Sequence, residues 1–402
     1  MKKILLWVTV LMISVSMVIS FSLVSCKAAE ETTTEETVAE ETVAEETTAE
    51  GTAEMSEDEL FEKLYGDIYG ATINFLGWQG YDGAGVIEPF LEKYNITLNT
   101  VFVNNNEEIF TKLKAGGGSR YDIVTPYFGI LPAFLESDLL EPLDLSLLPN
   151  YEDSFDIFKN VDWNKVDGKI YSVPFVWGIT GFLYNADEVE TPTTFDILLD
   201  PQYKNKIIIQ EDGVGSTVEA ALWLGFENAT MLTEEQLEQV YDRLVELKKN
   251  TRYLSPSFGD VQKALESGEA LMCFNGWDAV AMWCQANGVN IKTAIPDEGT
   301  HAFVDNYCIP KGAKNQMAAY AFIHYLTQPE VQAEFCAILS SGVVNKKSVE
   351  FLPEINKNAY PYDDLEEYFT KIHLCPPTPL ESDEFTTTAD WAAMWERFKL
   401  AE

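Results

Sequence analysis

Hydrophobic and polar residues follow three different patterns along this chain. Residues 4–24 are almost wholly apolar and follow Lys2 and Lys3, residues 36–54 repeat a polar unit of five, and later apolar residues occur in short runs. The basic start and apolar run predict an export signal. The repeat has no aromatic residue and cannot bury enough apolar surface to fold, so it predicts a disordered acidic spacer.

The apolar run ends in Leu23-Val24-Ser25-Cys26, which resembles the lipobox of bacterial lipoproteins. This predicts a signal peptide over residues 1–25, an acylated Cys26, and a tether over residues 26–62. The alternative is an uncleaved membrane anchor, because about 20 apolar residues can span a bilayer. Either interpretation places the mature chain in the periplasm or on the outer face of the cytoplasmic membrane.

The body that follows alternates strands with helices. Strands are predicted at 71–76, 98–103, 121–125, 206–209, 270–274 and 289–294. Helices are predicted at 86–94, 107–113, 216–224, 233–249, 261–267, 316–326 and 329–339. Such alternation with short loops favours an α/β architecture with mostly parallel sheets. In sheets of this kind ligands bind beyond the carboxyl ends of the strands.

The last helix has an apolar stripe at the i, i+3, i+4, i+7 spacing, formed by Trp391, Met394, Trp395 and Phe398. This spacing predicts a packing face rather than a ligand site.

Charge excludes one class of partner. The chain has 27 Lys and Arg against 65 Asp and Glu, a net charge of −38. Such a chain repels phosphate backbones, so no nucleic-acid partner is expected. About a quarter of the excess lies before residue 60, and residues 60–402 still carry −28, from 24 basic and 52 acidic residues. A negative field speeds capture of cations, but solubility or a saline habitat explains the same excess.

Few residues are suited to catalysis, metal binding or cross-linking. The three histidines are scattered, and the five cysteines after Cys26 show no CxxC spacing and lie mostly in apolar contexts. We interpret these cysteines as core residues. No Gly-x-Ser-x-Gly elbow or phosphate loop occurs, so neither a serine nucleophile nor a phosphate cradle is indicated. No cofactor and no metal are expected.

Aromatic and acidic residues recur instead at predicted strand ends. Trp78 and Tyr81 follow the first strand, Glu211-Asp212 follow the strand at 206–209, and Phe274 to Asp278 and Phe303 to Asp305 adjoin later strands. Carboxylates framed by aromatic faces suit an organic cation. The alternative is that the rings are core residues and the acids cap helices or lie in solvated loops.

Several segments, in order, resemble the spermidine/putrescine-binding branch of the bacterial extracellular solute-binding proteins of ABC transporters. They lie between about Ile73 and Val344, and the most specific is Tyr171-Ser-Val-Pro-Phe-Val-Trp-Gly178 running on to Tyr184-Asn185. The others are Phe75–Trp78 with Tyr81, Lys112–Lys114 through Tyr121–Val124, Asp200–Lys204, Phe274–Gly276, Ala294–Gly299 and Asp305 through Ile309–Ala313. The resemblance implies a two-lobed periplasmic-binding-protein-like (type II) α/β fold, with a ligand cleft between the lobes. It implies lobe one at 66–182 plus 303–345, and lobe two at 183–302 plus 346–402.

The resemblance carries over only part of the family's site. The stacking Trp and Tyr match Trp78 and Tyr81, and two family acids match Asp212 and Asp305. Two other family acids fall at Gly80 and Gly215, and two family tryptophans are Phe274 and Phe303. Asp82, Glu211 or Asp278 are candidates to compensate. The candidate ligand-binding residues are Trp78, Tyr81, Tyr127, Asp212, Phe274, Trp277, Asp278, Phe303 and Asp305.

The implied function is a monomeric, lipid-anchored receptor that captures a small cationic amine and delivers it to the transmembrane subunits of an ABC permease. It performs no chemistry on the ligand. Two acids in opposite lobes favour a putrescine-like diamine over a triamine. The alternatives are a receptor for an amino-acid derivative or sugar, a surface hydrolase using paired carboxylates, and a structural or adhesive lipoprotein.

Overall fold

The computed structural model describes residues 56–83, 85–103, 106–159, 161–375, 378–379 and 381–401. By contacts the chain divides into two units, Met1–Glu54 and Met55–Glu402, and the described residues belong to the second. The predicted signal peptide, Cys26 and most of the predicted tether lie outside the described residues. Within those residues, no helix has the length and apolar character needed to cross a membrane.

The predicted tether ends earlier than residue 62. Helix α1 (Glu57–Tyr65) begins after Ser56, whose hydroxyl accepts from the Glu59 N–H while the Glu59 carboxylate accepts from the Ser56 N–H. This capping box satisfies two backbone donors at the helix start. Phe61 and Tyr65 are buried. The last acidic residues of the predicted spacer therefore belong to a packed helix.

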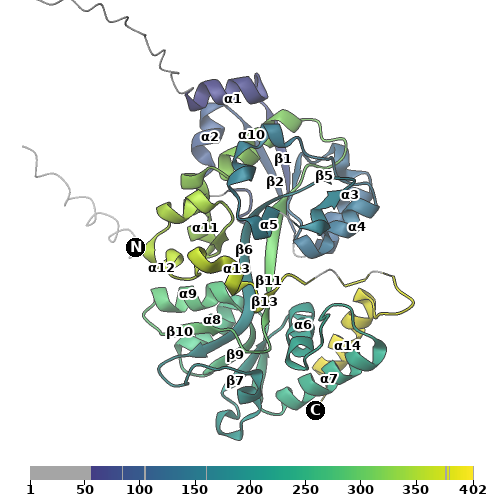
Figure 1. The fold of residues 1–402 in the computed structure, drawn as a ribbon, viewed down its shortest axis with the longest axis vertical. Coiled ribbons are helices and arrows are strands. Elements are labelled where there is room, and N and C mark those ends of the chain that lie inside the picture. Colours follow the sequence, from purple (N-terminus) through teal and green to yellow (C-terminus); the bar gives the residue numbers. More distant parts are fainter. Residues whose placement is uncertain are drawn as a thin grey trace, which may run out of the picture. The chain divides into compact units, whose positions relative to one another are not determined.

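The first sheet is small and wholly parallel. Its strands are β1 (Thr72–Gly77), β2 (Thr97–Phe102) and β3 (Ile123–Val124), in the order β2-β1-β3. The helices around it in Figure 1 are α1, α2 (Glu88–Lys93), α3 (Asn106–Lys114), α4 (Leu131–Glu136) and α10 (Gln316–Leu326). This part agrees with the predicted alternation.

The second sheet is mixed. Its order is β13-β11-β6-β9-β7-β8, and β10 and β12 also pair with β6. Its strands are β6 (Val173–Asn185), β7 (Ile207–Gln210), β8 (Thr251–Ser255), β9 (Met272–Trp277), β10 (Ile291–Ala294), β11 (Thr300–Tyr307), β12 (Gly342–Val343) and β13 (Ile372–His373). The helices of this half are α6 (Gly213–Trp223), α7 (Glu234–Lys248), α8 (Phe258–Glu266), α9 (Asp278–Ala286) and α14 (Thr388–Leu400).

The prediction of mostly parallel sheets is wrong for the centre of this second sheet. β7 pairs in parallel with β8 and β9, but β6 is antiparallel to β9, β10, β11 and β12. The reason is that β6 runs 13 residues through both halves of the body (Figure 1), and β11 returns beside it in the opposite direction.

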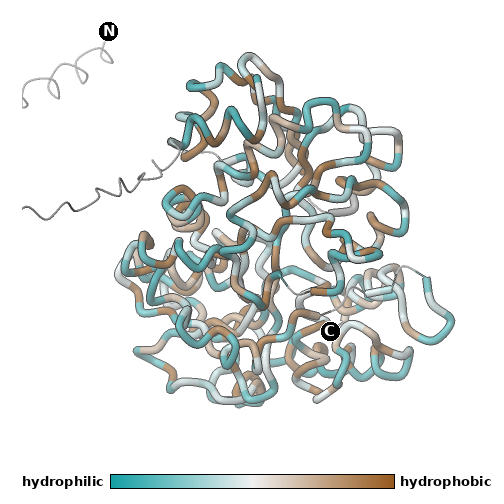
Figure 2. The backbone as a smooth tube through the Cα atoms, turned by 45° about the horizontal axis from the view of Figure 1, so that its top comes forward, coloured by the Kyte–Doolittle hydropathy of each residue, from teal (hydrophilic) through white to brown (hydrophobic). Residues whose placement is uncertain are grey.

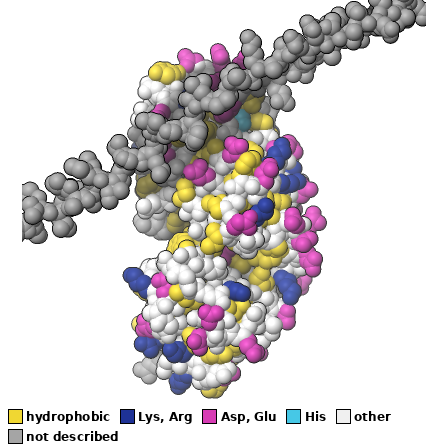
Figure 3. All heavy atoms as spheres, turned by 90° about the vertical axis from the view of Figure 1, so that its left-hand side faces the viewer, with side chains coloured by type: hydrophobic (Ala, Val, Ile, Leu, Met, Phe, Trp, Pro, Cys, Tyr) yellow, Lys and Arg dark blue, Asp and Glu magenta, His cyan; other side chains and the backbone are white. Residues whose placement is uncertain are grey.

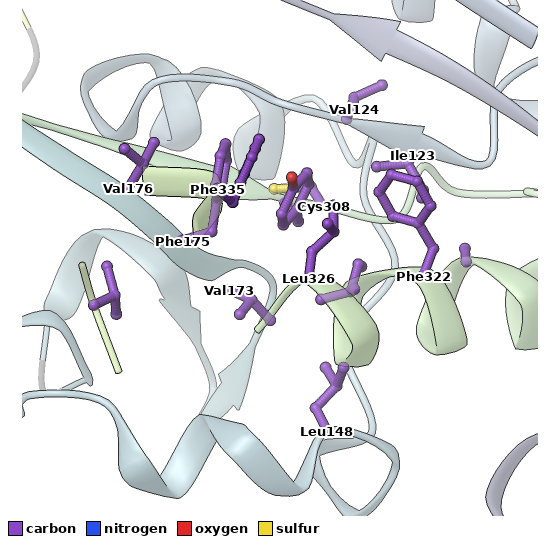
Figure 4. Close-up of a cluster of buried hydrophobic side chains, with 14 of the residues drawn as sticks. Ile123, Val124, Leu148, Val173, Phe175, Val176, Cys308, Phe322, Leu326 and Phe335 are labelled. Carbon is purple, nitrogen blue, oxygen red and sulfur yellow. The ribbon is translucent and has the colours of Figure 1, made fainter. Parts of the chain in front are cut away.

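Buried apolar residues form one large cluster and two smaller ones. We call the elements around the first cluster lobe one, and those around the other two lobe two. β6 contributes to all three, with Ile179 in the first cluster, Phe182 in the second and Leu183 in the third. Phe175 stacks on Phe335 in the lobe-one core, near Cys308 (Figure 4). Hydrophobic and hydrophilic stretches alternate along the backbone in both halves (Figure 2).

The packing places residues 346–372 in lobe one, not in lobe two as predicted. Leu352, Tyr360, Tyr362, Leu365 and Ile372 all belong to the first cluster. Tyr360 packs on Trp177, with ring centroids 4.5 Å apart. The segment contains α12 (Glu354–Lys357) and α13 (Leu365–Tyr368), and its buried rings pack in the lobe-one cluster. The chain enters lobe two again at Cys375, which belongs to the second cluster.

Two other predictions are confirmed. The stripe of Trp391, Met394, Trp395 and Phe398 is buried in the second cluster. Each of the five described cysteines is buried and unbridged.

Among the described residues no group of His, Cys, Asp and Glu is arranged to hold a metal ion. Other elements are the four-residue helix α5 (Asp156–Lys159), the 11-residue helix α11 (Pro329–Leu339) and the β4–β5 hairpin (Lys165–Val166, Lys169–Ile170).

Candidate functional site

Asp305 is the centre of the candidate site. It lies on β11 and is only 6% exposed, and the Tyr81 hydroxyl donates to its Oδ2 at 2.5 Å. Burial raises the pKa of Asp305 to about 7, although the hydrogen bond from Tyr81 lowers it. Burial and the neighbouring Asp305 charge raise the pKa of Tyr81. The site therefore contains a buried carboxylate whose negative charge is poorly compensated.

The loop after β1 holds Tyr81 in place. The Tyr307 hydroxyl donates to the Tyr81 carbonyl at 2.8 Å, and the Tyr81 ring packs edge-on against Phe175 at 5.0 Å. Trp78, in the same loop, is anchored by its backbone N–H, which donates to Thr125 Oγ1 at 3.3 Å. Both predicted stacking residues are partly exposed and lie against the core of lobe one.

Tyr127 lies near both Asp305 and Asp212. Its backbone pairs with that of Asp305 in an isolated antiparallel bridge. Burial raises the pKa of the Tyr127 phenol, and the neighbouring Cys375, Asp305 and Asp212 raise it further. Asp305 and Asp212, which are 93 positions apart in sequence, therefore both lie within electrostatic reach of one phenol.

Asp212 is the N-cap of α6. Its Oδ1 accepts hydrogen bonds from the N–H groups of Val214 and Gly215, both at 3.1 Å. The side chain is partly exposed. The carboxylate is thus stabilised by the helix terminus, while Oδ2 takes part in neither of these two bonds.

A second buried carboxylate, Asp278, adjoins the predicted ring of Phe303. Asp278 Oδ2 accepts from the Tyr360 hydroxyl at 2.6 Å and from the Ile179 N–H at 3.0 Å. Burial raises the pKa of Asp278 to about 7. Both Asp278 Oδ1 and the Phe303 ring lie against Gly178. A Cβ placed on Gly178 would stand 3.1 Å from Asp278 Oδ1 and 2.6 Å from the Phe303 ring.

Trp277 completes this second group. Its ring centroid lies 6.3 Å from that of Phe303 and 5.0 Å from that of Phe258. Within the described residues, Trp277 Nε1 and Asp278 Oδ1 are buried without a hydrogen-bond partner. A pocket of about 440 Å³ opens beside Asp278, and its wall includes Ile179, Met282, Lys292 and Tyr360.

Phe274 is placed differently from the other predicted site residues. It is fully buried and packs against Phe195 at 5.7 Å and Trp223 at 6.2 Å, within the second cluster. The structure therefore gives it a core position in lobe two rather than bringing it to the acids. Alternation explains this, because successive residues of β9 point to opposite faces of the sheet.

The structure places the three candidate compensating acids, Asp82, Glu211 and Asp278, in different environments. Glu211 pairs with Lys399 at 3.6 Å, and Asp82 is buried near Tyr307, whose pKa it raises. Asp278 lies beside the predicted site ring of Phe303. Sequence reasoning missed Thr125 and Tyr307, which hold the loop of Trp78 and Tyr81, and Tyr360 and Asn275, which bond to Asp278 and Asp212. Of these four residues, the sequence motifs point only to Asn275, through the Asn-Gly pair at 275–276.

The arrangement suits binding of a cation. Two buried acids and a helix-capping acid are accompanied by the partly exposed rings of Trp78, Tyr81, Tyr127, Trp277 and Phe303. Aromatic faces and carboxylates are the groups that hold organic ammonium ions. Acidic side chains also scatter over the face in Figure 3 rather than gathering at one place, so total charge does not locate the site.

Two lobes, long antiparallel strands shared between them, and acids and rings grouped around those strands define a two-lobed solute-binding protein of type II fold. The chain belongs to the bacterial extracellular solute-binding protein family, whose model matches residues 85–361.

Its relatives include the putrescine-binding periplasmic protein PotF of Escherichia coli K12, 27% identical over 73% of this chain and 84% of that protein. Another is a putrescine/agmatine-binding protein of Pseudomonas aeruginosa, 28% identical over 70% of this chain and 80% of that protein. Among solved structures, the spermidine/putrescine ABC transporter substrate-binding protein PotD of Streptococcus pneumoniae matches with a TM-score of 0.69. It is 25% identical and covers 83% of this chain and 99% of that chain.

Proposed function

We propose that this protein is the substrate-binding component of an ABC transporter, capturing a small polyamine or related organic cation outside the cytoplasmic membrane and delivering it to the permease. The observation that carries the proposal is the buried Asp305 carboxylate, which accepts from the Tyr81 hydroxyl and whose backbone pairs with that of Tyr127. A ligand ammonium would supply the positive charge that this carboxylate lacks. No chemistry on the ligand is involved.

The acids support a diamine over a triamine. Two family acids are replaced by Gly80 and Gly215, which leaves Asp305 and Asp212 for the two ends of a ligand. Asp278 offers a further negative group beside Phe303. The names of the relatives, which include putrescine-binding proteins, point to the same class of ligand.

We also propose attachment to the membrane by lipid at Cys26, with residues before 56 as a spacer. The lipobox-like sequence before Cys26 supports this. Incorporation of labelled palmitate by the wild type and not by a Cys26→Ser variant is the expected result. Equal labelling of the two proteins would contradict it.

The function is tested with the soluble body and a panel of putrescine, spermidine, agmatine, amino acids and sugars. We expect amines to raise the melting temperature and to bind in calorimetry, and Asp305→Asn to weaken that binding. Stabilisation by a sugar or amino acid without any effect of amines would replace the polyamine proposal with another transported solute.

A further inference from the structure

Asn275 has an unusual backbone and an unusual environment for a polar residue. It lies near the end of β9 with φ of 57°, in the left-handed region that non-glycine residues rarely adopt. Its side chain is fully buried. Strained backbone of this kind tends to occur at functional sites, where the surrounding structure holds it.

The carboxamide of Asn275 faces the start of α6. Its Nδ2 donates to Ser216 Oγ at 3.1 Å and to the Asp212 carbonyl at 3.4 Å. Its Oδ1 is buried without a hydrogen-bond partner among the described residues. Asn275 therefore binds the turn that carries Asp212 and retains an unused acceptor beside it.

Gly215 provides the space in which these groups meet. A Cβ on Gly215 would stand 2.3 Å from Asp212 Oδ2 and 2.6 Å from Asn275 Oδ1. Gly215 is inside α6 and does not have positive φ, so its backbone conformation is open to any residue. The absence of a side chain is thus required by the position of the Asp212 carboxylate, not by the backbone.

We propose that Asn275 and Gly215 are positioning residues for Asp212, and that together they fix its carboxylate to receive a single ammonium group of the ligand. This rests on the proposed function. Asp212 Oδ1 accepts from the helix, Oδ2 lies over Gly215, and the neutral carboxamide of Asn275 adds no charge beside it. The lobe-two end of the site therefore receives one terminal ammonium group of the ligand.

The test compares Gly215→Ala and Asn275→Gly, titrated with putrescine by calorimetry, in the wild-type and Asp212→Asn backgrounds. Asn275→Gly removes the carboxamide but tolerates positive φ. Gly259→Ala is the matched control, because Gly259 also lies in the first turn of a helix and its Cβ would meet only Ser257 Oγ, at 3.9 Å. Melting temperatures of all variants separate loss of folding from loss of binding.

We expect each substitution to weaken putrescine binding about tenfold when Asp212 is present and less than about twofold in Asp212→Asn, since residues in one network are not additive. Gly259→Ala should bind like the wild type. Equal losses in both backgrounds, or wild-type affinity in Gly215→Ala, would overturn the inference while leaving the proposed function intact. A wild-type protein that binds no amine would overturn both.

Discussion

The two acids that the family resemblance predicts for the site, Asp305 and Asp212, are held in opposite ways. Asp305 is buried on a strand shared by the lobes, with a tyrosine hydroxyl on Oδ2, and its pKa is raised to about 7. Asp212 is partly exposed at a helix start and accepts two backbone N–H groups. The charge of the first carboxylate is poorly compensated, whereas the second is stabilised by the start of α6.

This difference implies a division of work between the two ends of the site. Burial strengthens the attraction between a carboxylate and an ammonium, because little water screens it. We therefore expect most of the affinity, and most of its pH dependence, to come from Asp305. Asp212 is expected to contribute selectivity and a smaller share of affinity. The following predictions test this ranking.

The largest effect is expected from Asp305→Asn. Removing one partner of a buried charge pair typically costs about 2–5 kcal/mol, so putrescine affinity should fall roughly thirtyfold or more. Calorimetry measures this directly. Asp383→Asn, which removes the same charge at an exposed position, is the control and should bind normally. Unchanged affinity in Asp305→Asn would refute the site assignment.

The next effect is a loss of affinity on acidification. The Asp305 carboxyl of the free protein has a pKa of about 7, so below pH 7 it is mostly protonated and must release a proton to pair with an ammonium. Between pH 8 and 5.5 affinity should fall about thirtyfold, at tenfold per pH unit below the pKa. Titrations in buffers of different ionisation enthalpy should show proton release near pH 6. Because Asp278 has a similar pKa, Asp305→Asn should lose part of this dependence, and a pH-independent affinity would contradict the argument.

A smaller and mixed effect is expected at Asp212. Asp212→Ala removes the N-cap of α6, so it should lower the free energy of unfolding by about 1 kcal/mol. It also removes a candidate ligand acid, so putrescine binding should weaken about tenfold, which corresponds to about 1.4 kcal/mol. Asp212→Asn retains a capping oxygen, so it should weaken binding with little change in melting temperature. If both variants lose more affinity than Asp305→Asn, the ranking of the two acids is reversed.

The smallest effect is expected from Tyr81→Phe. The Tyr81 hydroxyl lowers the pKa of Asp305, so its removal should move the midpoint of the affinity–pH curve upward. Above that midpoint putrescine affinity should fall only severalfold, because the carboxylate and the ring remain. A downward shift of the midpoint would show that the hydroxyl does not stabilise the charged carboxylate.

Much of the fold was predictable, because local patterns decide it. The strands around 72–77 and 207–210 and the helices at 316–326 and 329–339 follow from apolar spacing, and the structure has them at nearly those bounds. The antiparallel pairing of β6 with β11 was not predictable, because it depends on contacts between residues more than 100 positions apart. The placement of residues 346–372 in lobe one likewise depends on where Tyr360 and Tyr362 find a partner surface.

The candidate site divides in the same way. Sequence pattern and family resemblance together name Trp78, Tyr81, Asp212 and Asp305. The first three follow recognisable strands, whereas Asp305 is named by the resemblance and lies within β11. Pattern and resemblance also name Phe274, which the alternation of β9 turns into the lobe-two core. They leave Asp82, Glu211 and Asp278 equivalent, although Asp278 lies beside Phe303.

The sequence by itself determined an α/β body, its solute-binding family, its acidic character and most of the candidate acids, because residue types and short-range spacing carry that information. Only the tertiary structure decided which acid is buried, which caps a helix and which pairs with a lysine. Burial and hydrogen bonding arise from elements that meet in space, as when Tyr81, 224 positions before Asp305, donates to its carboxylate. Those contacts set the charge of each acid, and hence its expected role in binding.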